Sequence, residues 1–133
     1  MKLPEAFIQR MITHAKKESP RECCGIIAAK DGKAVKLYKS RNVSEDLHKY
    51  VLHPTDFKRI HSDLRKNDFD IFATYHSHPR TEAYPSGDDV ELTMGSFFPY
   101  IIVSIQDPDC ASVRAFRIDR GGITEELVET EEN

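Results

Sequence analysis

The chain has 133 residues, of which 39% are hydrophobic and 31% charged, and its net charge is −3. This length fits one domain with its own core, and the balance of apolar and charged residues excludes a disordered chain. No basic block indicates nucleic acid or an anionic membrane as a partner, and no apolar run approaches the ~20 residues of a membrane span. We expect a single domain over residues 1–128, followed by an acidic, frayed tail at 129–133.

The cysteines and the first residues bear on the cellular compartment. Cys23, Cys24 and Cys110 are odd in number and two of them are adjacent, so they do not build a disulfide framework. We expect Cys23 and Cys24 to be small buried residues, as free cysteines commonly are. Residues 1–5 lack the apolar core of a signal peptide, so we expect a cytoplasmic protein.

The first third of the chain predicts a helix followed by a hairpin of two strands. Apolar residues recur every four positions, as the buried face of a helix requires: Leu3, Phe7, Met11 and Ala15. Ser19-Pro20 ends this helix, because a residue before proline avoids the helical region. Residues 22–29 predict a strand buried on both faces, and Asp31-Gly32 predicts a tight turn into a strand at 33–39.

The middle of the chain predicts a second helix and the clearest strand. Residues 50–52 are a short strand candidate. A helix follows, with Thr55 as its N-cap. Its apolar face holds residues about one or two turns apart: Phe57, Ile60 and Leu64. Residues 69–78 contain little that is polar before the two histidines at their end, and they predict a buried strand.

The last part of the chain predicts a third helix and three more strands. Ser86 is placed to cap this helix. Its apolar face would hold Val90, Met94 and Phe97. Strands are expected at 100–105, 112–118 and 123–128. Because helices and strands are mixed along the chain, the predicted fold class is α/β, with a mixed, mostly antiparallel sheet flanked by about three helices.

Two histidines at the end of the clearest strand indicate a metal site. Residues i and i+2 of a strand face the same way, so His76 and His78 present two imidazoles on one face while Ser77 faces the other. Pro79 removes a backbone donor and ends the strand. Two neutral imidazoles and a carboxylate make a catalytic zinc site that leaves one coordination position for water.

Asp89 is the carboxylate that we expect to complete this set. A helix capped by Ser86 has Asp89 at its third position, from which the side chain can aim back at the strand end. The neighbouring Asp88 is the other candidate. Ser86-x-x-Asp89 also fits a capping box, and aspartates favour a helix N-terminus without any metal. The upstream histidines favour the metal interpretation, since capping does not require them.

A hydrolytic zinc site also needs a base for the metal-bound water and donors for the developing oxyanion. Glu22 is the leading candidate for the base, because a carboxylate at the start of a buried strand calls for a reason. The alternative is an ordinary surface glutamate at a strand end. Ser86 can donate its hydroxyl to the oxyanion in addition to capping a helix.

Other metal enzymes also carry two histidines at this spacing. The metallo-β-lactamase pattern fails, because Arg80 and Thr81 stand where it requires aspartate and histidine. A cupin-type metal enzyme fits the spacing, with Glu82 as a further ligand. That fold is an all-β barrel, and three helical stripes argue against it. The cupin nevertheless stays an alternative at this point.

The chain resembles the JAMM metallopeptidases, also called MPN+ domains, and in particular their prokaryotic stand-alone type. The motif of that family is an upstream glutamate, then H-x-H-P, a short spacer and S-x-x-D. The matching residues here are Glu22, His76-Ser77-His78-Pro79 and Ser86-Gly87-Asp88-Asp89. The resemblance spans roughly residues 3–125, and it implies a cytidine-deaminase-like α/β fold.

The resemblance also implies a site and an activity. His76, His78 and Asp89 would bind Zn²⁺, Glu22 would activate the zinc-bound water and then protonate the leaving amine, and Ser86 would stabilise the oxyanion. Family substrates are amide bonds after the C-terminal glycine of ubiquitin-like proteins, including a sulfur carrier from which cysteine is released. We therefore expect a zinc metallopeptidase or isopeptidase whose partner is a ubiquitin-like or sulfur-carrier protein with a Gly-Gly tail, and a homodimer is compatible with this. The alternative within the family is a metal-free MPN scaffold that only binds partners.

Overall fold

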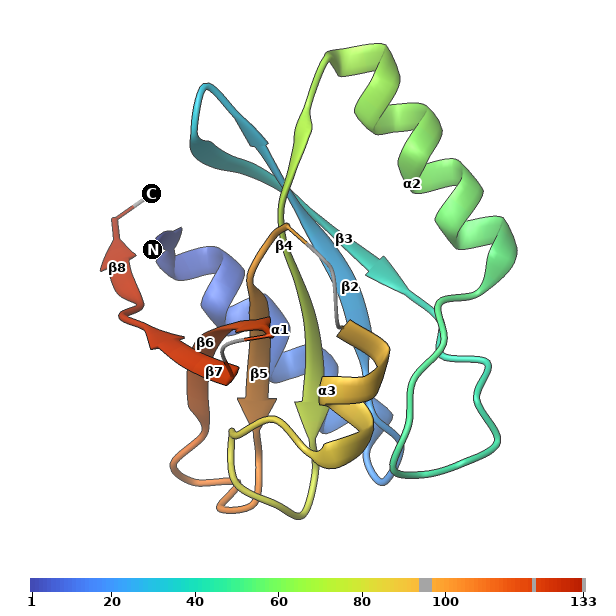
Figure 1. The fold of residues 1–133 in the computed structure, drawn as a ribbon, viewed down its shortest axis with the longest axis vertical. Helices are drawn as coiled ribbons and strands as arrows, with labels where there is room; N and C mark the ends of the chain where they lie inside the picture. The colour runs from blue at the N-terminus through green and yellow to red at the C-terminus, as the bar shows by residue number, and fades with distance from the viewer. Residues whose placement is uncertain (94–96, 121, 133) are drawn as a thin grey trace.

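The computed structural model describes residues 1–93, 97–120 and 122–132 (Figure 1). The described residues form three helices and eight strands. In chain order these are β1 (Lys2–Pro4), α1 (Glu5–Glu18), β2 (Cys24–Lys30), β3 (Lys33–Ser40), α2 (Pro54–Asn67), β4 (Asp70–His78), α3 (Gly87–Thr93), β5 (Tyr100–Ser104), β6 (Ser112–Asp119), β7 (Gly122–Glu126) and β8 (Glu129–Glu131). Among the described helices, none has both the length and the apolar character that crossing a membrane requires.

A six-stranded sheet forms the centre of the molecule, with the strand order β3-β2-β4-β5-β6-β7. β4 and β5 pair in parallel. β2 pairs antiparallel with β3 and β4, and β6 pairs antiparallel with β5 and β7. The described helices flank this sheet (Figure 1). The prediction of a mixed, mostly antiparallel sheet with about three helices is therefore confirmed.

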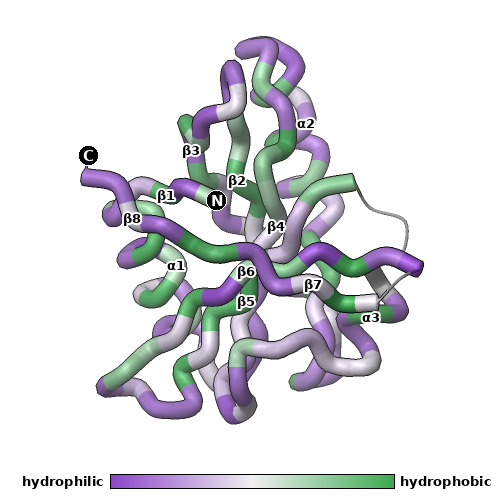
Figure 2. Tube along the Cα trace, turned by 60° about the vertical axis from the view of Figure 1, so that its left-hand side comes forward, coloured by the Kyte–Doolittle hydropathy of each residue, from purple (hydrophilic) through white to green (hydrophobic). Residues whose placement is uncertain are grey.

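Apolar side chains cover both faces of the sheet. Because successive residues of a strand face opposite ways, the neighbours Ile26 and Ile27 of β2 serve different layers. The layer under α1 includes Met11, Ala15, Ile27, Ala73 and Ile101. α2 packs on the other face through Ile60 and Leu64, which contact the cluster of Ile26. Figure 2 shows the hydrophobic residues gathered along the central strands, whereas β8 is hydrophilic.

The parallel pairing of β4 and β5 determines where α3 lies. Parallel neighbours need a crossover connection, and residues 79–99, which include α3, provide it. β4 ends at His78, and Cys24 at the start of β2 pairs with His76. The end of β4, the start of β2 and the crossover thus meet at one end of the sheet (Figure 1). This end carries the polar residues predicted for the site.

The start of α2 differs from the prediction. Its N-cap is His53 and not Thr55, because Pro54 takes the first helical position. The Nδ1 atom of His53 accepts a hydrogen bond from the Thr55 backbone N–H at 3.1 Å. Phe57, expected on the buried face, is 46% exposed, and Asp56 is buried in its place. The helix was predicted with the correct period, but its buried face includes Asp56 and not Phe57.

The ends of the other two helices also differ from the prediction. Leu3 is buried as expected, but it lies on β1, and α1 begins at Glu5. α3 ends at Thr93, so Phe97 lies beyond the helix, and its side chain is 95% exposed. The prediction that Met94 belongs to the buried face of this helix lies outside the described residues.

Two of the strand predictions are corrected. Residues 50–52 do not form a strand, since only Leu52 makes an isolated bridge, with Asn42. The strand predicted at 22–29 begins at Cys24, so Glu22 lies in the loop that precedes β2. Because Glu22 lies outside the strand, the alternation of side chains along β2 does not determine the direction of its side chain.

The acidic tail at residues 129–133 was expected to be frayed, but the structure pairs residues 129–131. β8 lies parallel to β1, with Leu3 opposite Thr130. The Glu129 N–H donates a hydrogen bond to the Met1 carbonyl at 2.7 Å, and the Met1 ammonium group donates to the Leu127 carbonyl at 2.8 Å. Backbone pairing therefore orders this segment. Its acidic side chains face solvent and do not oppose the pairing.

Candidate metal centre and active site

Three buried polar side chains converge at the end of β4. The Nε2 atom of His76 lies 3.1 Å from Oδ1 of Asp89, and the Nε2 atom of His78 lies 3.0 Å from Oδ2 of Asp89. The two Nε2 atoms are 3.3 Å apart. All three residues are at most 4% exposed. Of the described residues, these form a group whose ligand atoms can hold a metal ion.

The backbone around His78 fixes which of its ring nitrogens faces the cluster. The Nδ1 atom lies 2.9 Å from the carbonyl oxygen of Glu82 in the loop after β4. Because a carbonyl can only accept, Nδ1 carries the hydrogen and Nε2 keeps its lone pair. A histidine that binds a metal commonly donates its other N–H in this way.

The cluster needs a positive charge between its members. The lone pair of His78 Nε2 faces the Asp89 carboxylate at 3.0 Å, and two acceptors at this distance repel each other unless a proton or a cation lies between them. Ligands at about 2.0–2.1 Å from a tetrahedral zinc ion are about 3.3 Å apart. The observed separations of 3.0, 3.1 and 3.3 Å therefore fit a small divalent ion, and the donor set suits zinc.

The protonation states of His76 and Asp89 agree with this role. Burial lowers the pKa of His76, which favours the neutral imidazole that a ligand must be. Burial acts to raise the pKa of Asp89, but the contacts with His76 and His78 outweigh it and hold that pKa below its usual range. Asp89 is therefore a carboxylate. Burial acts to lower the pKa of His78, but the contact with Asp89 outweighs it and raises that pKa, so that in the metal-free protein a proton can lie between the two side chains.

Asp89 has both of the roles that the sequence left open, because it caps α3 and also contacts the two histidines. Its backbone N–H donates to the hydroxyl oxygen of Ser86 at 3.1 Å, and its Oδ2 atom accepts from the Ser86 backbone N–H at 2.9 Å. This is a reciprocal capping box at the start of α3. The capping contacts hold the same carboxylate against the two histidines. Asp88 is half-buried and does not belong to the cluster, as far as the described residues show.

Glu22 is buried beside this cluster, and one of its carboxyl oxygens has no hydrogen-bond partner among the described atoms. The residue is 5% exposed, and that oxygen is Oε1. Burial raises the pKa of Glu22 to about 8, although the neighbouring His78 acts to lower it. A carboxyl group with a pKa near neutrality can both take up and release a proton.

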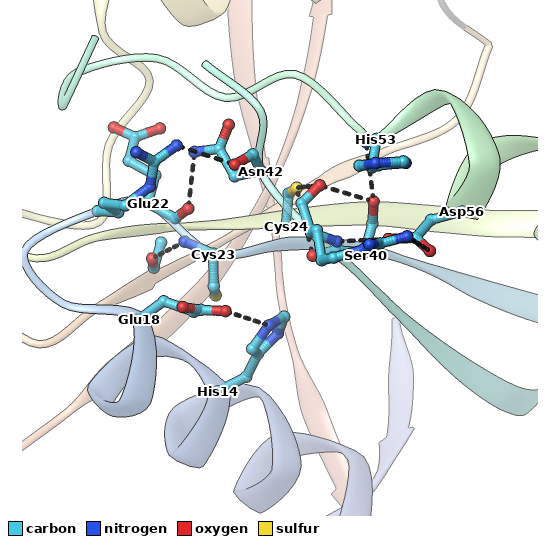
Figure 3. A network of polar contacts seen from close by, with 12 residues as sticks. His14, Glu18, Glu22, Cys23, Cys24, Ser40, Asn42, His53 and Asp56 are labelled. Atoms are coloured by element: carbon cyan, nitrogen blue, oxygen red, sulfur yellow. Dashed lines mark hydrogen bonds and ion pairs between the residues drawn. The ribbon is translucent and has the colours of Figure 1, made fainter. Parts of the chain in front are cut away.

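Asn42 fixes the backbone of Glu22, and the sequence did not point to it. Its Nδ2 atom donates to the Glu22 carbonyl at 2.9 Å and to the Lys49 carbonyl at 3.2 Å. Its Oδ1 atom accepts from the backbone N–H groups of Ser44 and Val51. Figure 3 shows Asn42 beside Glu22. One amide side chain thus joins the loop that carries Glu22 to the loop between β3 and α2.

The same loop brings Tyr50 onto the metal cluster. The ring of Tyr50 stacks on the ring of His76, with centroids 4.5 Å apart and planes at 19°. His76 Nδ1 is buried and, within the described part of the chain, has no hydrogen-bond partner. Stacking therefore restrains this imidazole where a hydrogen bond does not. An aromatic residue in an irregular loop gives no sequence signal for such a contact.

The other candidates from the sequence do not join the cluster. The side chain of Glu82 is exposed, and only its backbone carbonyl reaches His78. Together with the helices, this overturns the cupin alternative. The remaining histidines are also outside the cluster, among the residues described: His14, His48, His53 and His61.

The comparisons with known proteins agree with this geometry. The family described as prokaryotic homologs of the JAB domain matches residues 4–119. The chain belongs to this family. A CysO-cysteine peptidase of Mycobacterium tuberculosis (strain ATCC 25618 / H37Rv) is 32% identical to it over 124 residues, which cover 92% of this chain and 85% of the relative.

Solved structures of other proteins share the fold. The solution structure of the protein DSY2949 from Desulfitobacterium hafniense has a TM-score of 0.89 at 27% identity and covers 99% of this chain and 93% of its own. A structure described as "JAMM: A Metalloprotease-like Zinc Site in the Proteasome and Signalosome" has a TM-score of 0.64 at 21% identity, with 99% of this chain and 98% of its own covered. The JAB family and its peptidase member support a peptidase role in general, and the cluster is consistent with a metal site.

Proposed function

We propose that this protein is a zinc-dependent metallopeptidase that hydrolyses the amide bond after the C-terminal glycine of a ubiquitin-like sulfur-carrier protein with a Gly-Gly tail. The observation that carries the proposal is the convergence of two imidazole Nε2 atoms and a carboxylate beside a buried, unpaired glutamate. The identity to a CysO-cysteine peptidase supports the choice of substrate class.

His76, His78 and Asp89 would hold the zinc ion in this proposal. When bound, zinc supplies Lewis acidity, which makes water more acidic and polarises the scissile carbonyl. The carbonyl of Glu82 orients the His78 ring, and the ring of Tyr50 orients His76. Three protein ligands leave one coordination position open, as catalytic zinc sites require.

Glu22 would move the proton. Its carboxylate takes a proton from the attacking water, and the resulting carboxylic acid gives that proton to the leaving amine. The raised pKa of about 8 in the metal-free protein matches a group that must be protonated in one half of the reaction and deprotonated in the other. The bond from Asn42 to the Glu22 carbonyl keeps the side chain directed at the site.

Ser86 would stabilise the oxyanion. Its hydroxyl oxygen accepts a hydrogen bond from the Asp89 N–H at 3.1 Å, and a hydroxyl that accepts still has its own O–H to donate. The side chain is exposed next to the buried ligand Asp89. It can therefore reach a substrate carbonyl that approaches the metal from solvent.

Metal analysis and one substitution test the proposal. Protein purified without chelator or added metal should contain about one zinc per chain, and it should release cysteine from a sulfur carrier whose C-terminal glycine is joined to cysteine. Glu22→Gln should keep the zinc and lose turnover by about two orders of magnitude or more. Glu22→Gln with near wild-type turnover would show that the base is another group.

Glu82→Gln is the matched control. It changes an exposed carboxylate four residues after a ligand histidine and leaves the backbone carbonyl in place. This variant should keep both zinc and turnover, whereas a cupin-type site would lose its metal. A wild-type protein without metal and without metal-dependent turnover would favour the metal-free scaffold.

A further inference from the structure

A cavity lies next to Glu22, and the site described above gives no role to the arginines that border it. Its volume is about 320 Å³, and its described lining does not include the three residues of the metal cluster. It is bounded by the loop that precedes β2, by the first residues after β3 and by the N-cap of α2 (Figure 3). Four of the residues that line it have side chains with nitrogen donors, and those of Arg21, Arg41 and His53 can be cationic, whereas Asn42 is neutral.

Arg41 lines this cavity, and its side chain, which is 63% exposed, is anchored by Asp56. Its Nε and Nη2 atoms each donate to the carboxylate of Asp56 at 3.0 Å, and its backbone N–H donates to Oδ2 of Asp56 at 2.8 Å. Asp56 is buried, so this fork has one orientation. The Nη1 atom of Arg41 is not used in these contacts and can bind a further acceptor.

His53 and Arg21 add donors to the same cavity. His53 Nδ1 accepts from the Thr55 N–H, so in the neutral ring the hydrogen is on Nε2, which has no protein partner among the described atoms. Arg21 uses Nη2 for the carbonyls of Asn42 and Ser44, which leaves its Nε and Nη1 hydrogens. The fourteen-residue helix α2 begins here as well, and its dipole adds positive potential at this end.

One acidic side chain at this cavity has its charge directed elsewhere. The carboxylate of Glu18, which also lines the cavity, lies 3.9 Å from Nε2 of His14. The other acidic lining residue is Glu22 itself, whose buried Oε1 has no hydrogen-bond partner in the described part of the chain. The cavity thus combines several unused N–H donors with the proposed proton-transfer group, which is the chemistry of a site for an amine that bears a carboxylate.

We propose that this cavity binds the α-carboxylate of the amino acid that leaves when the amide bond is cleaved; this inference rests on the proposed function. In a C-terminal amino acid the carboxylate carbon is two bonds from the scissile nitrogen. Glu22 protonates that nitrogen in the proposed mechanism, so the carboxylate lies a few ångströms from Glu22. Arg41, His53 and Arg21 line the same cavity as Glu22.

This cavity would distinguish between two kinds of leaving group. A free amino acid such as cysteine brings a carboxylate next to its amine, and the arginines bind it. The side-chain amine of a lysine in an isopeptide has no carboxylate at that distance, and it places a flexible stem against two cations. The cavity therefore specifies hydrolysis that releases a single amino acid, in preference to hydrolysis of a lysine isopeptide.

The test compares two substrates that differ only in this carboxylate. The zinc-loaded protein is given a sulfur carrier with C-terminal cysteine and the same carrier with cysteine carboxamide. Wild type should prefer the carboxylate, by about tenfold or more in kcat/KM, because an Arg–carboxylate contact is charge-assisted. In Arg41→Gln this preference should fall to near one. Arg65→Gln, on the exposed face of α2, is the control and should keep the preference.

The ratio of two substrates on one preparation does not depend on how much of a variant is folded. A wild type without preference, or an Arg41→Gln variant that keeps it, would overturn the inference. If neither substrate is cleaved, the proposed function fails, and the affinities of the two uncleaved conjugates for wild type and Arg41→Gln still decide the subsite. Equal affinities for the two conjugates in wild type would overturn it.

Discussion

The hydroxyl of Ser77 accepts a hydrogen bond from the backbone N–H of Cys23 at 2.7 Å, across 54 residues of sequence. The Ser77 N–H in turn donates to the Cys23 carbonyl at 3.1 Å. Ser77 stands between the two cluster histidines but faces the α1 side of β4, and Cys23 directly follows Glu22. The pair therefore ties the proposed base to the strand that carries two of the proposed ligands.

Ser77→Ala should destabilise the protein by about 1–3 kcal/mol, because the buried Cys23 N–H loses its acceptor. Urea unfolding of the metal-free protein measures this change. The exposed Ser112 of β6 provides a control, and Ser112→Ala should stay within about 0.5 kcal/mol of wild type. Equal effects of the two substitutions would show that the Ser77 contact contributes no stability.

Gly25→Ala should be more damaging than its small size suggests. A Cβ atom at Gly25 would lie 2.3 Å from the Tyr38 carbonyl oxygen and 2.3 Å from a ring carbon of Tyr75. Neither the backbone of β3 nor a fully buried ring can move away cheaply, so we expect a loss of about 3 kcal/mol. Thermal unfolding checks this, with Gly87→Ala, whose Cβ would meet nothing within 4 Å, as the neutral control. A Gly25→Ala variant as stable as wild type would mean that β2 can shift within the sheet.

His14 should make the protein less stable in mild acid. Its Nδ1 atom lies 2.8 Å from the hydroxyl of Tyr75, and burial lowers its pKa from the ordinary value of 6.5. The unfolded chain therefore binds the proton more readily, so the stability due to neutral His14 is complete above pH 6.5 and is lost as the pH falls below it.

His14→Gln removes this titration. Unfolding free energies of the metal-free proteins at about pH 7.5 and about pH 5.5 should show a smaller loss in the variant than in wild type. The cluster histidines titrate in both proteins, so their contribution cancels in the comparison. An equal loss in both proteins would mean that His14 does not change its charge in this range.

Tyr50 should support metal binding through its ring and not its hydroxyl. Tyr50→Leu removes the stack on His76 and should weaken zinc binding by about tenfold, as loss of a residue that orients a ligand usually does. Tyr50→Phe keeps the ring and should bind zinc like wild type. Competition with a coloured chelator measures both affinities. A Tyr50→Phe variant as weak as Tyr50→Leu would assign the effect to the hydroxyl.

The sheet and the cluster residues could be predicted because their signals are local. Alternation along β4 places His76 and His78 on one face, and the spacing from Ser86 to Asp89 predicts the capping box that the structure contains. Hydrophobic period predicted every helix of the described residues, although the α2 face was misassigned at Phe57.

What could not be predicted depends on contacts between distant loops. The four hydrogen bonds of Asn42 and the stack of Tyr50 on His76 involve polar loop residues with no period. The strand at β8 was missed because its acidic side chains suggested fraying, whereas the order comes from backbone pairing with β1. The cavity at Arg41 likewise exists only once β3, α2 and the loop before β2 are packed together.

The crossover between β4 and β5 has a consequence for local unfolding. α3 has seven residues in the described part of the chain, and Asp89 links it to the end of β4. An ion held by both would act as a cross-link that closes a short loop. Removal of that ion should raise amide hydrogen exchange in the crossover first and leave the central strands protected. The end of the sheet that carries the His76–His78–Asp89 cluster would then open as a unit of its own, well before the rest of the domain.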